Sequence, residues 1–361
     1  MKIVFIGATP QARVYKQVIA LKRKYKIKIS LICFRYDKIL FKGIFDKVTI
    51  LPKGDPFSQI VEYLNTNKLD VIHLFSDKLS IANAVIQSKI PYVFDPYDYF
   101  LEQENMSKKE LLTHWQIITS SANAILLRYD ENIKNNSFFK QLNLENKLIV
   151  QMYDYCLEDY FIKKSQTREN RIVHIGYVSK ISASEAFSAT KFDKVALTVA
   201  PIIPYDIFCS LWSDEFELLK KEYITVKNQL KDSFNLYPTL SQQELNQRIS
   251  TYKYGSYIHD PIVKNINTAY IKCSVGNKIF NYLEAGLPII TTSELESSSN
   301  FVKKYKIGFC LESMYSLKNN IKNIELSYEE FLSNCYEVRE KQLNIMTHIY
   351  KLYELYCKVR G

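Results

Sequence analysis

Short apolar runs alternate with stretches of helical spacing along the first half of the chain. Residues 3–6 are apolar and end at Gly7, which predicts a buried strand, and residues 10–24 place apolar side chains at helical spacing. The same pattern predicts further strands at residues 27–33, 71–75, 92–94, 124–127 and 148–152, and helices at residues 56–64, 79–87 and 108–118. Repeated strand–helix–strand units predict a parallel sheet that helices cover on both faces.

A polar stretch, residues 163–170, interrupts this alternation, and we interpret it as a linker. Strand–helix alternation then restarts with a strand that ends at Gly176. The second half predicts strands at residues 171–176, 195–200, 255–258 and 288–291, and helices at residues 214–226 and 277–285. A serine followed by a glutamate three residues later is typical of a helix start, and this capping box occurs at Ser241 and at Ser327. We expect the second box to open one long terminal helix.

We therefore expect an α/β protein with two doubly wound domains in tandem. The predicted domains are residues 1–165 and 166–326, and residues 327–361 form a terminal helix that packs back toward the first domain. In such sheets, ligands bind at the carboxyl ends of the strands. With two domains, the expected site is the cleft between them.

Composition narrows the class of protein. The apolar fraction of 47% and charged fraction of 24% are those of a globular chain, which argues against a disordered or fibrous protein. No apolar run approaches the roughly 18 residues of a membrane-spanning helix. The seven cysteines form no C-x-x-C pair and the five histidines have no metal-ligand spacing. We expect a reduced, cytoplasmic protein without a disulfide framework or metal site.

The positive charge is concentrated near the start of the chain. The formal net charge is +10, and the first 50 residues hold twelve lysines and arginines against two aspartates. The densest run comprises Lys22, Arg23, Lys24, Lys26 and Lys28. One interpretation is a solubilising face; the other is a peripheral contact with an anionic membrane, worth about 1 kcal/mol per cation. No nucleic-acid-binding motif accompanies the charge, so we expect no nucleic acid partner.

The segment with the clearest chemistry lies at residues 273–292. It combines a polar loop, a short helix, a glycine stop and a buried strand. The N–H groups at the start of such a helix can bind a phosphate group, helped by the helix dipole. The dipole disfavours a cation at Lys278, in the first turn, unless an anion is bound there; the alternative is a solvated lysine. The candidate phosphate-binding residues are Ser274, Gly276, Asn277 and Lys278.

This segment resembles a known family. Residues 277–290 read NKIFNYLEAGLPII, similar to the N-K-x-F-E-Y-L-A-A-G-x-P-V-I pattern of retaining GT-B glycosyltransferases of the large glycosyltransferase family 4, or group 1, class. Weaker similarities at residues 8–14, 69–73, 91–98 and 252–255 follow in the family's order. The resemblance implies two Rossmann-like domains, with the acceptor on the first and the donor on the second.

The resemblance also implies an activity. A sugar would pass from a nucleoside diphosphate donor to a glycan, glycolipid or protein acceptor, with retention and without a metal or other cofactor. Two departures concern the donor: Asn281 stands where relatives hold the ribose with a glutamate, and Cys273 stands where many carry a second glutamate. An amide can still hydrogen-bond a ribose hydroxyl. Glu284, one helical turn further on, is an alternative ribose ligand or a solvated helix residue.

Other candidates are weaker. Lys180, after the strand that ends at Gly176, is a candidate second cation for the diphosphate or a surface lysine. Candidate residues on the acceptor side are Gly7, Arg13, Tyr97 and Asp98, where Tyr97 replaces a family histidine. Asp98 and Lys180 are the candidate catalytic residues, and we name no protein nucleophile. Two other functions stay open: a catalytically inactive GT-B subunit that serves as a binding partner, and a sugar-nucleotide epimerase.

Overall fold

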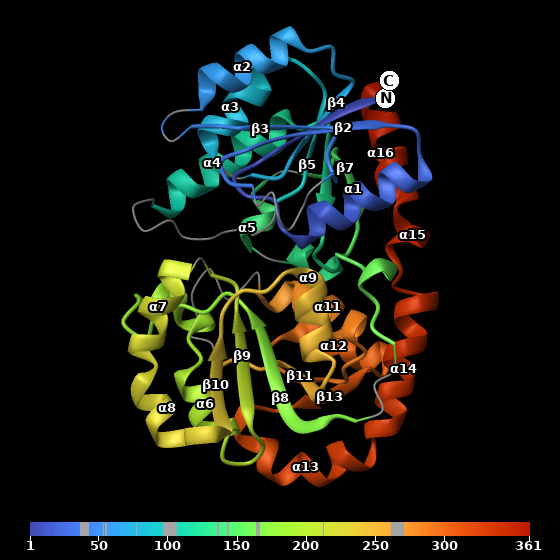
Figure 1. Cartoon of the computed structure of the whole chain (residues 1–361). Helices are drawn as coiled ribbons and strands as arrows, with labels where there is room; N and C mark the ends of the chain where they lie inside the picture. Colours follow the sequence, from blue (N-terminus) through green and yellow to red (C-terminus); the bar gives the residue numbers. More distant parts are fainter. Residues whose placement is uncertain are drawn as a thin grey trace. The chain divides into compact units, whose positions relative to one another are not determined.

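The computed structural model describes residues 1–36, 43–52, 54, 56–76, 78–96, 107–135, 137–142, 144–163, 167–211, 213–260 and 271–361. It divides into two compact units (Figure 1). Unit 1 comprises Met1–Tyr155 with Ile345–Gly361, and unit 2 comprises Cys156–Asn344. Each unit holds one parallel sheet with its own helices, so the predicted α/β class with two Rossmann-like domains is confirmed.

Seven parallel strands form the sheet of unit 1, in the order β3-β2-β1-β4-β5-β6-β7. The strands are β1 (Lys2–Ile6), β2 (Lys28–Cys33), β3 (Lys47–Ile50), β4 (Val71–Leu74), β5 (Tyr92–Phe94), β6 (Ala124–Leu127) and β7 (Leu148–Gln151). The helices are α1 (Ala12–Lys24), α2 (Phe57–Thr66), α3 (Leu79–Gln87), α4 (Lys108–Ser121), α5 (Ser137–Lys140), α15 (Ile345–His348) and α16 (Tyr350–Arg360), with a 3₁₀ turn η1 (Glu131–Asn135). The central strand β4 is buried at every residue, as a strand with both faces covered requires.

Six parallel strands form the sheet of unit 2, in the order β10-β9-β8-β11-β12-β13. The strands are β8 (Glu169–Gly176), β9 (Tyr205–Cys209), β10 (Phe234–Tyr237), β11 (Tyr252–Tyr257), β12 (Ile289–Thr292) and β13 (Gly308–Leu311). The helices are α6 (Asp193–Val199), α7 (Ser213–Glu222), α8 (Ile224–Leu230), α9 (Gln242–Ile249), α11 (Asn277–Ala285), α12 (Glu296–Tyr305), α13 (Leu317–Leu326) and α14 (Tyr328–Lys341). Short 3₁₀ turns are η2 (Glu158–Tyr160), η3 (Glu185–Thr190), η4 (Lys231–Ser233) and η5 (Met314–Ser316).

Both sheets reverse their strand order beside the first strand of the unit. In unit 1 the chain moves from β1 outward to β3 and then returns to β4 on the other side of β1; in unit 2, β8 has the same place between β9 and β11. Loops on the two sides of such a reversal diverge and leave room for a ligand at the carboxyl ends of the strands. This topology directs attention to the residues that follow β1 and β8.

The predicted strand at residues 195–200 is wrong, because this segment forms α6. Val195, Ala196 and Val199 are the buried residues of the helix, at a spacing that places them on one face. A short apolar run suits a buried strand and a buried helix equally well, so periodicity alone could not separate the two. The strand of this region is β9, five residues beyond the end of the predicted one.

The boundary between the units lies at residues 155 and 156, ten residues before the predicted one. The segment after Cys156 is held by helices of unit 2. The Leu157 N–H donates to Glu284 Oε1 (2.8 Å), and Asn246 Nδ2 donates to the Tyr160 carbonyl (3.1 Å). Residues 156–163 therefore pack as part of unit 2, and the polarity of the stretch that follows does not mark the division.

The predicted long terminal helix is also wrong, because residues 328–360 form three helices. The helical conformation ends after α14 and resumes at α15. Between the two helices, the Leu343 carbonyl accepts a hydrogen bond from the Cys156 N–H (2.7 Å). Helix α14 belongs to unit 2, whereas α15 and α16 belong to unit 1. No helix among the described residues is long and apolar enough to cross a membrane.

The two predicted capping boxes have different outcomes. At α9, Glu244 N–H donates to Ser241 Oγ (3.3 Å) and Ser241 N–H donates to Glu244 Oε2 (3.1 Å), which confirms the first box. At α14, Ser327 makes no side-chain cap. Helix α13 ends at Leu326, so Ser327 is the single residue between α13 and α14. Ser327 therefore has φ −91° and ψ 2°, not the extended backbone that a capping serine requires.

Candidate functional site

Helix α11 starts and ends as the sequence predicts. Its N-cap is Gly276, which has extended backbone and no side chain that could cap the helix. Its C-cap is Gly286, with φ +71°, and the N–H of Leu287 donates to the Tyr282 carbonyl (2.8 Å) to close the last turn. The first N–H groups of any α-helix have no partner within the helix. With a glycine at the N-cap, α11 is suited to satisfy them with a ligand.

The loop before α11 is fixed by a serine that sequence reasoning missed. Ser298 Oγ accepts from the Gly276 N–H (3.2 Å) and donates to the Ser274 carbonyl (2.9 Å). Ser274 is buried and donates its own hydroxyl to the Ile271 carbonyl (3.3 Å), so its side chain shapes the turn. A Cβ at Gly276 would lie 2.5 Å from the ring of Tyr257, so only glycine fits there.

Lys278 lies across the end of β8. Gly176, the last residue of β8, has φ +121°, and a Cβ there would lie 2.7 Å from Lys278 Cε. Lys278 Nζ also lies 5.4 Å from the ring centroid of Tyr257, within range of a cation–π contact. Gly176 therefore makes room for the lysine, and the two residues bring a cation to the carboxyl end of the first strand of unit 2.

Two buried histidines border this lysine, and neither was predicted. His174 is in β8 and His259 follows β11; the His259 Nδ1 lies 2.5 Å from the Ala189 carbonyl oxygen. Burial, with the charge of Lys278 as a second cause, lowers the pKa of His259 to about 3 and the pKa of His174 well below its usual value. Both rings are therefore neutral at pH 7, and Lys278 carries the positive charge of this cluster.

The three residues that were considered for the donor, Cys273, Asn281 and Glu284, lie in different environments. Asn281 is half-buried in the second turn of α11, and Cys273 is half-buried before it. Glu284 is fully buried: its Oε1 accepts from the Leu157 N–H (2.8 Å) and its Oε2 from Asn246 Nδ2 (3.3 Å). Glu284 thus anchors the segment after Cys156. It is neither a solvated helix residue nor placed to hold a ribose.

Lys180 is exposed in the loop that follows β8. Hydrogen bonds hold this loop: Ser179 N–H donates to the Thr190 carbonyl (2.9 Å) within it, and Ser182 donates to the carboxylate of Glu222 at the end of α7. Hydrogen bonds from Ser182 lower the pKa of Glu222, and the nearby charge of Lys180 adds to the effect. Lys180 therefore remains a surface cation at the carboxyl side of the sheet.

In unit 1, Arg13 is buried and does not fit the predicted contact with phosphate or acceptor. Arg13 is 1% exposed, and its guanidinium lies 2.9 Å from Asp95 Oδ1 and donates to Asp154 Oδ1 (2.8 Å). Burial lowers the pKa of Arg13, but the charges of Asp95 and Asp154 outweigh it and raise the pKa. His73 Nε2 also lies 3.2 Å from Asp95 Oδ2, and His73 Nδ1 lies 2.7 Å from the Tyr356 hydroxyl. Arg13 is thus the centre of a buried network.

The other predicted residues on this side are not placed at a ligand. At Gly7, a Cβ would lie 2.1 Å from the ring of Phe75, so the glycine is required by the packing of a buried phenylalanine. Tyr97 and Asp98 lie outside the described residues. Within the part of the chain that the structure describes, no group of three or more histidine, cysteine or acidic residues could hold a metal ion.

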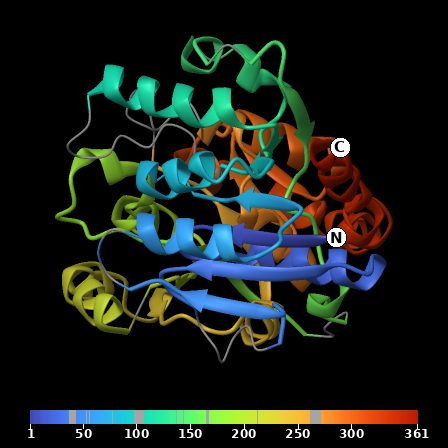
Figure 2. The ribbon, with the colours of Figure 1, turned by 90° about the horizontal axis from the view of Figure 1, so that it is seen from above.

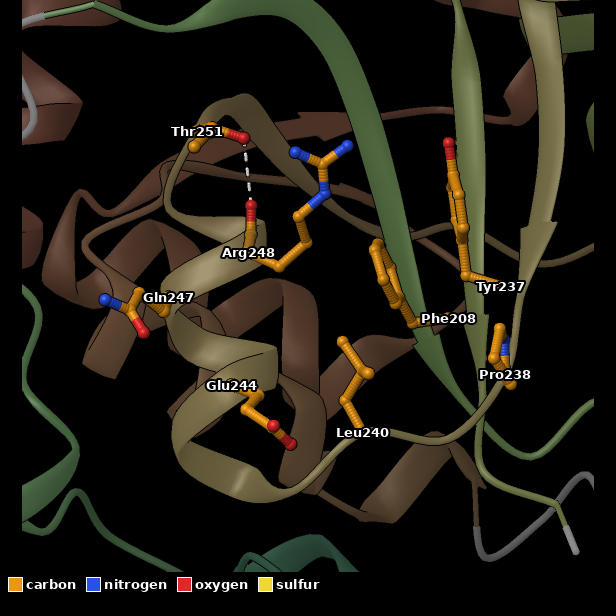
Figure 3. Close-up of a pocket in the computed structure, with 8 residues that line it drawn as sticks. All are labelled: Phe208, Tyr237, Pro238, Leu240, Glu244, Gln247, Arg248 and Thr251. Carbon is orange, nitrogen blue, oxygen red and sulfur yellow. Dashed lines mark hydrogen bonds between the residues drawn. The ribbon is translucent and has the colours of Figure 1, made fainter.

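A mostly apolar groove of about 500 Å³ lies elsewhere on unit 2, along α9 (Figure 3). Phe208 and Tyr237 stack with their ring centroids 4.7 Å apart, and Arg248 extends from α9 beside them. The lining residues are Phe208, Tyr237, Pro238, Leu240, Glu244, Gln247, Arg248 and Thr251. None of them belongs to the start of α11, and we locate the candidate donor site at α11, where charge and helix geometry coincide.

Comparisons with known proteins agree with this architecture. Residues 207–346 match the family model of the glucosyltransferase 3-like C-terminal domain. No curated protein matches the sequence. A glycosyltransferase from Rickettsia africae has a similar fold, with a TM-score of 0.65 at 12% identity, over 99% of this chain and 98% of the other.

Two plant enzymes are similar at lower scores. UGT2 of Phytolacca americana, solved with UDP-2-fluoro-glucose and pterostilbene, has a TM-score of 0.55 at 10% identity over 100% of both chains. A UDP-glucosyltransferase from Polygonum tinctorium has a TM-score of 0.52 at 9% identity over 99% of this chain and 98% of the other. Residues 207–346 thus match a glucosyltransferase domain, and the whole chain has the fold of GT-B glycosyltransferases.

Proposed function

We propose that the chain transfers a glycosyl group from a nucleoside diphosphate sugar whose diphosphate binds at the start of α11. The observation that carries the proposal is the position of Lys278, in the first turn of α11 and across Gly176 at the end of β8. A cation in the first turn is disfavoured by the helix dipole. A bound anion reverses that balance, because it attracts both the lysine and the helix N-terminus.

The surroundings favour a diphosphate leaving group. The neutral state of His174 and His259 leaves Lys278 as the charge that faces an anion at this edge. As the glycosidic bond to the donor breaks, negative charge builds up on the diphosphate, and a fixed cation with oriented N–H groups stabilises it. We assign Lys180, on the loop after β8, as a second cation for the same group.

We further propose that Asn281 holds the ribose of the donor. It is half-buried one turn after the start of α11, and its amide can both donate to and accept from a ribose hydroxyl. The match to a glucosyltransferase domain and the UDP-2-fluoro-glucose of the Phytolacca americana enzyme support UDP-glucose as the first donor to test. The acceptor class we propose is a glycan, a glycolipid or a protein, with retention at the anomeric carbon and without a metal or other cofactor.

Donor hydrolysis by the purified chain tests this function without knowledge of the acceptor. A panel of nucleoside diphosphate sugars, with UDP-glucose first, is incubated with and without EDTA, and release of the nucleoside diphosphate is measured. We expect slow hydrolysis of at least one donor, insensitive to EDTA, and NMR of the fresh product should show the anomer of the donor. An inverted product would contradict retention, and no turnover of any donor would contradict the enzymatic proposal.

A pair of lysine variants tests the site itself. Lys278→Ala should lower donor turnover by about a hundredfold, the usual cost of removing one preorganised charge stabiliser. Lys272→Ala is the matched control, because Lys272 is an exposed lysine six residues earlier that lies 3.6 Å from Glu296. Equal turnover in the two variants would contradict the assignment of Lys278.

A further inference from the structure

We propose that unit 1 binds anionic membrane surfaces through a cationic patch at the amino ends of its first strands. The patch, which we call the amino-end patch, comprises six exposed cations: Lys2, Arg23, Lys26, Lys28, Lys358 and Arg360. The sequence suggests only the cluster between residues 22 and 28; the structure adds cations from β1 and from α16. The proposal does not depend on the transfer reaction.

Strand register brings the first two lysines together. In β1 and β2, Lys2 and Lys28 are directly paired, and the Lys28 N–H donates to the Met1 carbonyl (3.0 Å). Both lysines are exposed, at the first position of their strands. Like charges directly opposite each other on neighbouring strands are destabilising. An anionic surface in contact with both would relieve that repulsion.

Helix α16 brings its cations to the same edge. Tyr25, the C-cap of α1, stacks on Tyr353 of α16 with ring centroids 3.7 Å apart. At the end of α16, Arg360 Nε lies 3.6 Å from Asp70 Oδ1, while Asp70 Oδ2 accepts from the Lys2 N–H (2.6 Å). Figure 1 shows the start of β1 and the end of α16 at the same end of unit 1, and Figure 2 shows this unit from above. The patch therefore joins residues more than 300 positions apart.

Only some of the cations between residues 22 and 28 are paired with other groups of unit 1. Lys22, one of the cations predicted for membrane contact, is half-buried with its Nζ 3.0 Å from Asp46, and Lys24 Nζ donates to the Met346 carbonyl (3.2 Å). These two lysines serve the fold of unit 1.

The patch lysines, by contrast, have no acidic partner: no carboxylate among the described residues is within salt-bridge distance of Lys2, Lys26 or Lys28. In the described part of unit 1, the acidic groups near the patch are Asp46, Asp70 and Glu354, and the first two already face Lys22 and Arg360.

An exposed tyrosine beside Lys24, the chain neighbour of Arg23, favours a membrane over a nucleic acid. Tyr350 of α16 is 40% exposed, and Lys24 Nζ lies 5.9 Å from its ring centroid. Tyrosines flanked by lysines suit the boundary between lipid head groups and acyl chains. A group of four to eight exposed cations is typical of proteins that bind anionic lipid head groups. We therefore commit to an anionic lipid bilayer as the partner.

Vesicle sedimentation tests the proposal with the full chain. The chain is mixed with vesicles of phosphatidylcholine alone, or of phosphatidylcholine with one third phosphatidylglycerol, at low and high salt. We expect binding to the anionic vesicles only, and loss of that binding at high salt because the charges are screened. The variant Lys2→Glu/Lys26→Glu/Lys28→Glu should bind at least about tenfold more weakly.

A control variant separates the patch from net charge. Lys303→Glu/Lys318→Glu/Lys322→Glu makes the same change in charge on exposed lysines of unit 2 and should keep vesicle binding within about twofold. Donor hydrolysis in solution should be unchanged in both variants, which separates this proposal from the proposed function and shows that both are folded. Equal binding to neutral vesicles, equal loss in the two variants, or binding to a short RNA without binding to vesicles would each overturn the proposal.

Discussion

The position of Lys278 depends on the lack of a side chain at Gly176. Because Gly176 has φ +121° and no Cβ, the aliphatic part of Lys278 can pass over the end of β8. Any larger residue at position 176 would be strained by its backbone and would meet the lysine. The sequence indicated both residues separately, as a glycine that ends a strand and a lysine that starts a helix. Their contact could not be predicted, because just over one hundred positions separate them.

Charged residues were the hardest to interpret from sequence. Arg13 and Glu284 each occur in a segment that resembles a ligand-binding segment of relatives, yet both are buried and paired within their unit. An ion in a protein interior must be paired, and the choice of partner is a tertiary property. For Arg13 the partners are Asp95 and Asp154, 82 and 141 positions away.

The buried histidines predict how stability depends on pH. His259 is neutral in the folded chain down to about pH 3, whereas an unfolded histidine titrates near pH 6.5. The unfolded chain therefore binds more protons between these values, and the free energy of unfolding should fall as the pH falls below about 6.5. His259 alone accounts for a slope of up to about 1.4 kcal/mol per pH unit.

Urea unfolding at several pH values between 4 and 7 measures this slope, and His259→Gln should reduce it, since glutamine does not titrate. A glutamine amide can still donate to the Ala189 carbonyl, so the variant keeps the hydrogen-bonding capacity of the ring. The same slope in both proteins would show that His259 is not held neutral.

Among the helices, α3 and α11 were predicted to the residue, whereas α6 and the break between α14 and α15 were not. The signals of α11 are local: glycines bound it on both sides, and apolar residues follow one face. The misassigned α6 is short and apolar, and its helical state depends on packing against the unit 2 core. The break between α14 and α15 depends on a hydrogen bond from Cys156, which no feature near residue 343 reveals.

Helix α16 predicts a measurable contribution to the stability of unit 1. Its Tyr356 hydroxyl is buried and pairs with His73 Nδ1 at 2.7 Å, next to the network around Arg13. Tyr356→Phe leaves a buried ring nitrogen without this partner and should lower the free energy of unfolding by about 1–3 kcal/mol.

Tyr350→Phe, on the same helix but 40% exposed, is the control for that change and should alter stability by less than about 0.5 kcal/mol. Urea denaturation of the two variants and the wild type gives the comparison. Equal stability of Tyr356→Phe and the wild type would show that the hydroxyl contributes nothing to the docking of α16.

For the whole molecule, the α/β class and the two doubly wound domains followed from strand–helix alternation, which is a local pattern that repeats. The GT-B architecture followed from the family resemblance of residues 277–290. The edge strands β3, β10 and β13 and the strand β9 were missed. The edge strand β3 is only partly buried, so it lacks the apolar run that marks a central strand. Helix α11 was predicted from local signals, and Lys278 as a donor ligand stays a prediction. Ser298, His174 and His259 were missed, because they lie near α11 through contacts that the sequence does not display.

Calorimetric titration with UDP and with uridine tests the central claim most directly, because the two ligands differ only in the diphosphate. If α11 and Lys278 hold that group, UDP should bind at least about tenfold more tightly than uridine, as expected for charge-assisted hydrogen bonds. Lys278→Ala should remove most of this difference and leave uridine binding unchanged. Equal affinities for UDP and uridine in the wild type, or an undiminished preference for UDP in Lys278→Ala, would contradict a diphosphate site at the start of α11.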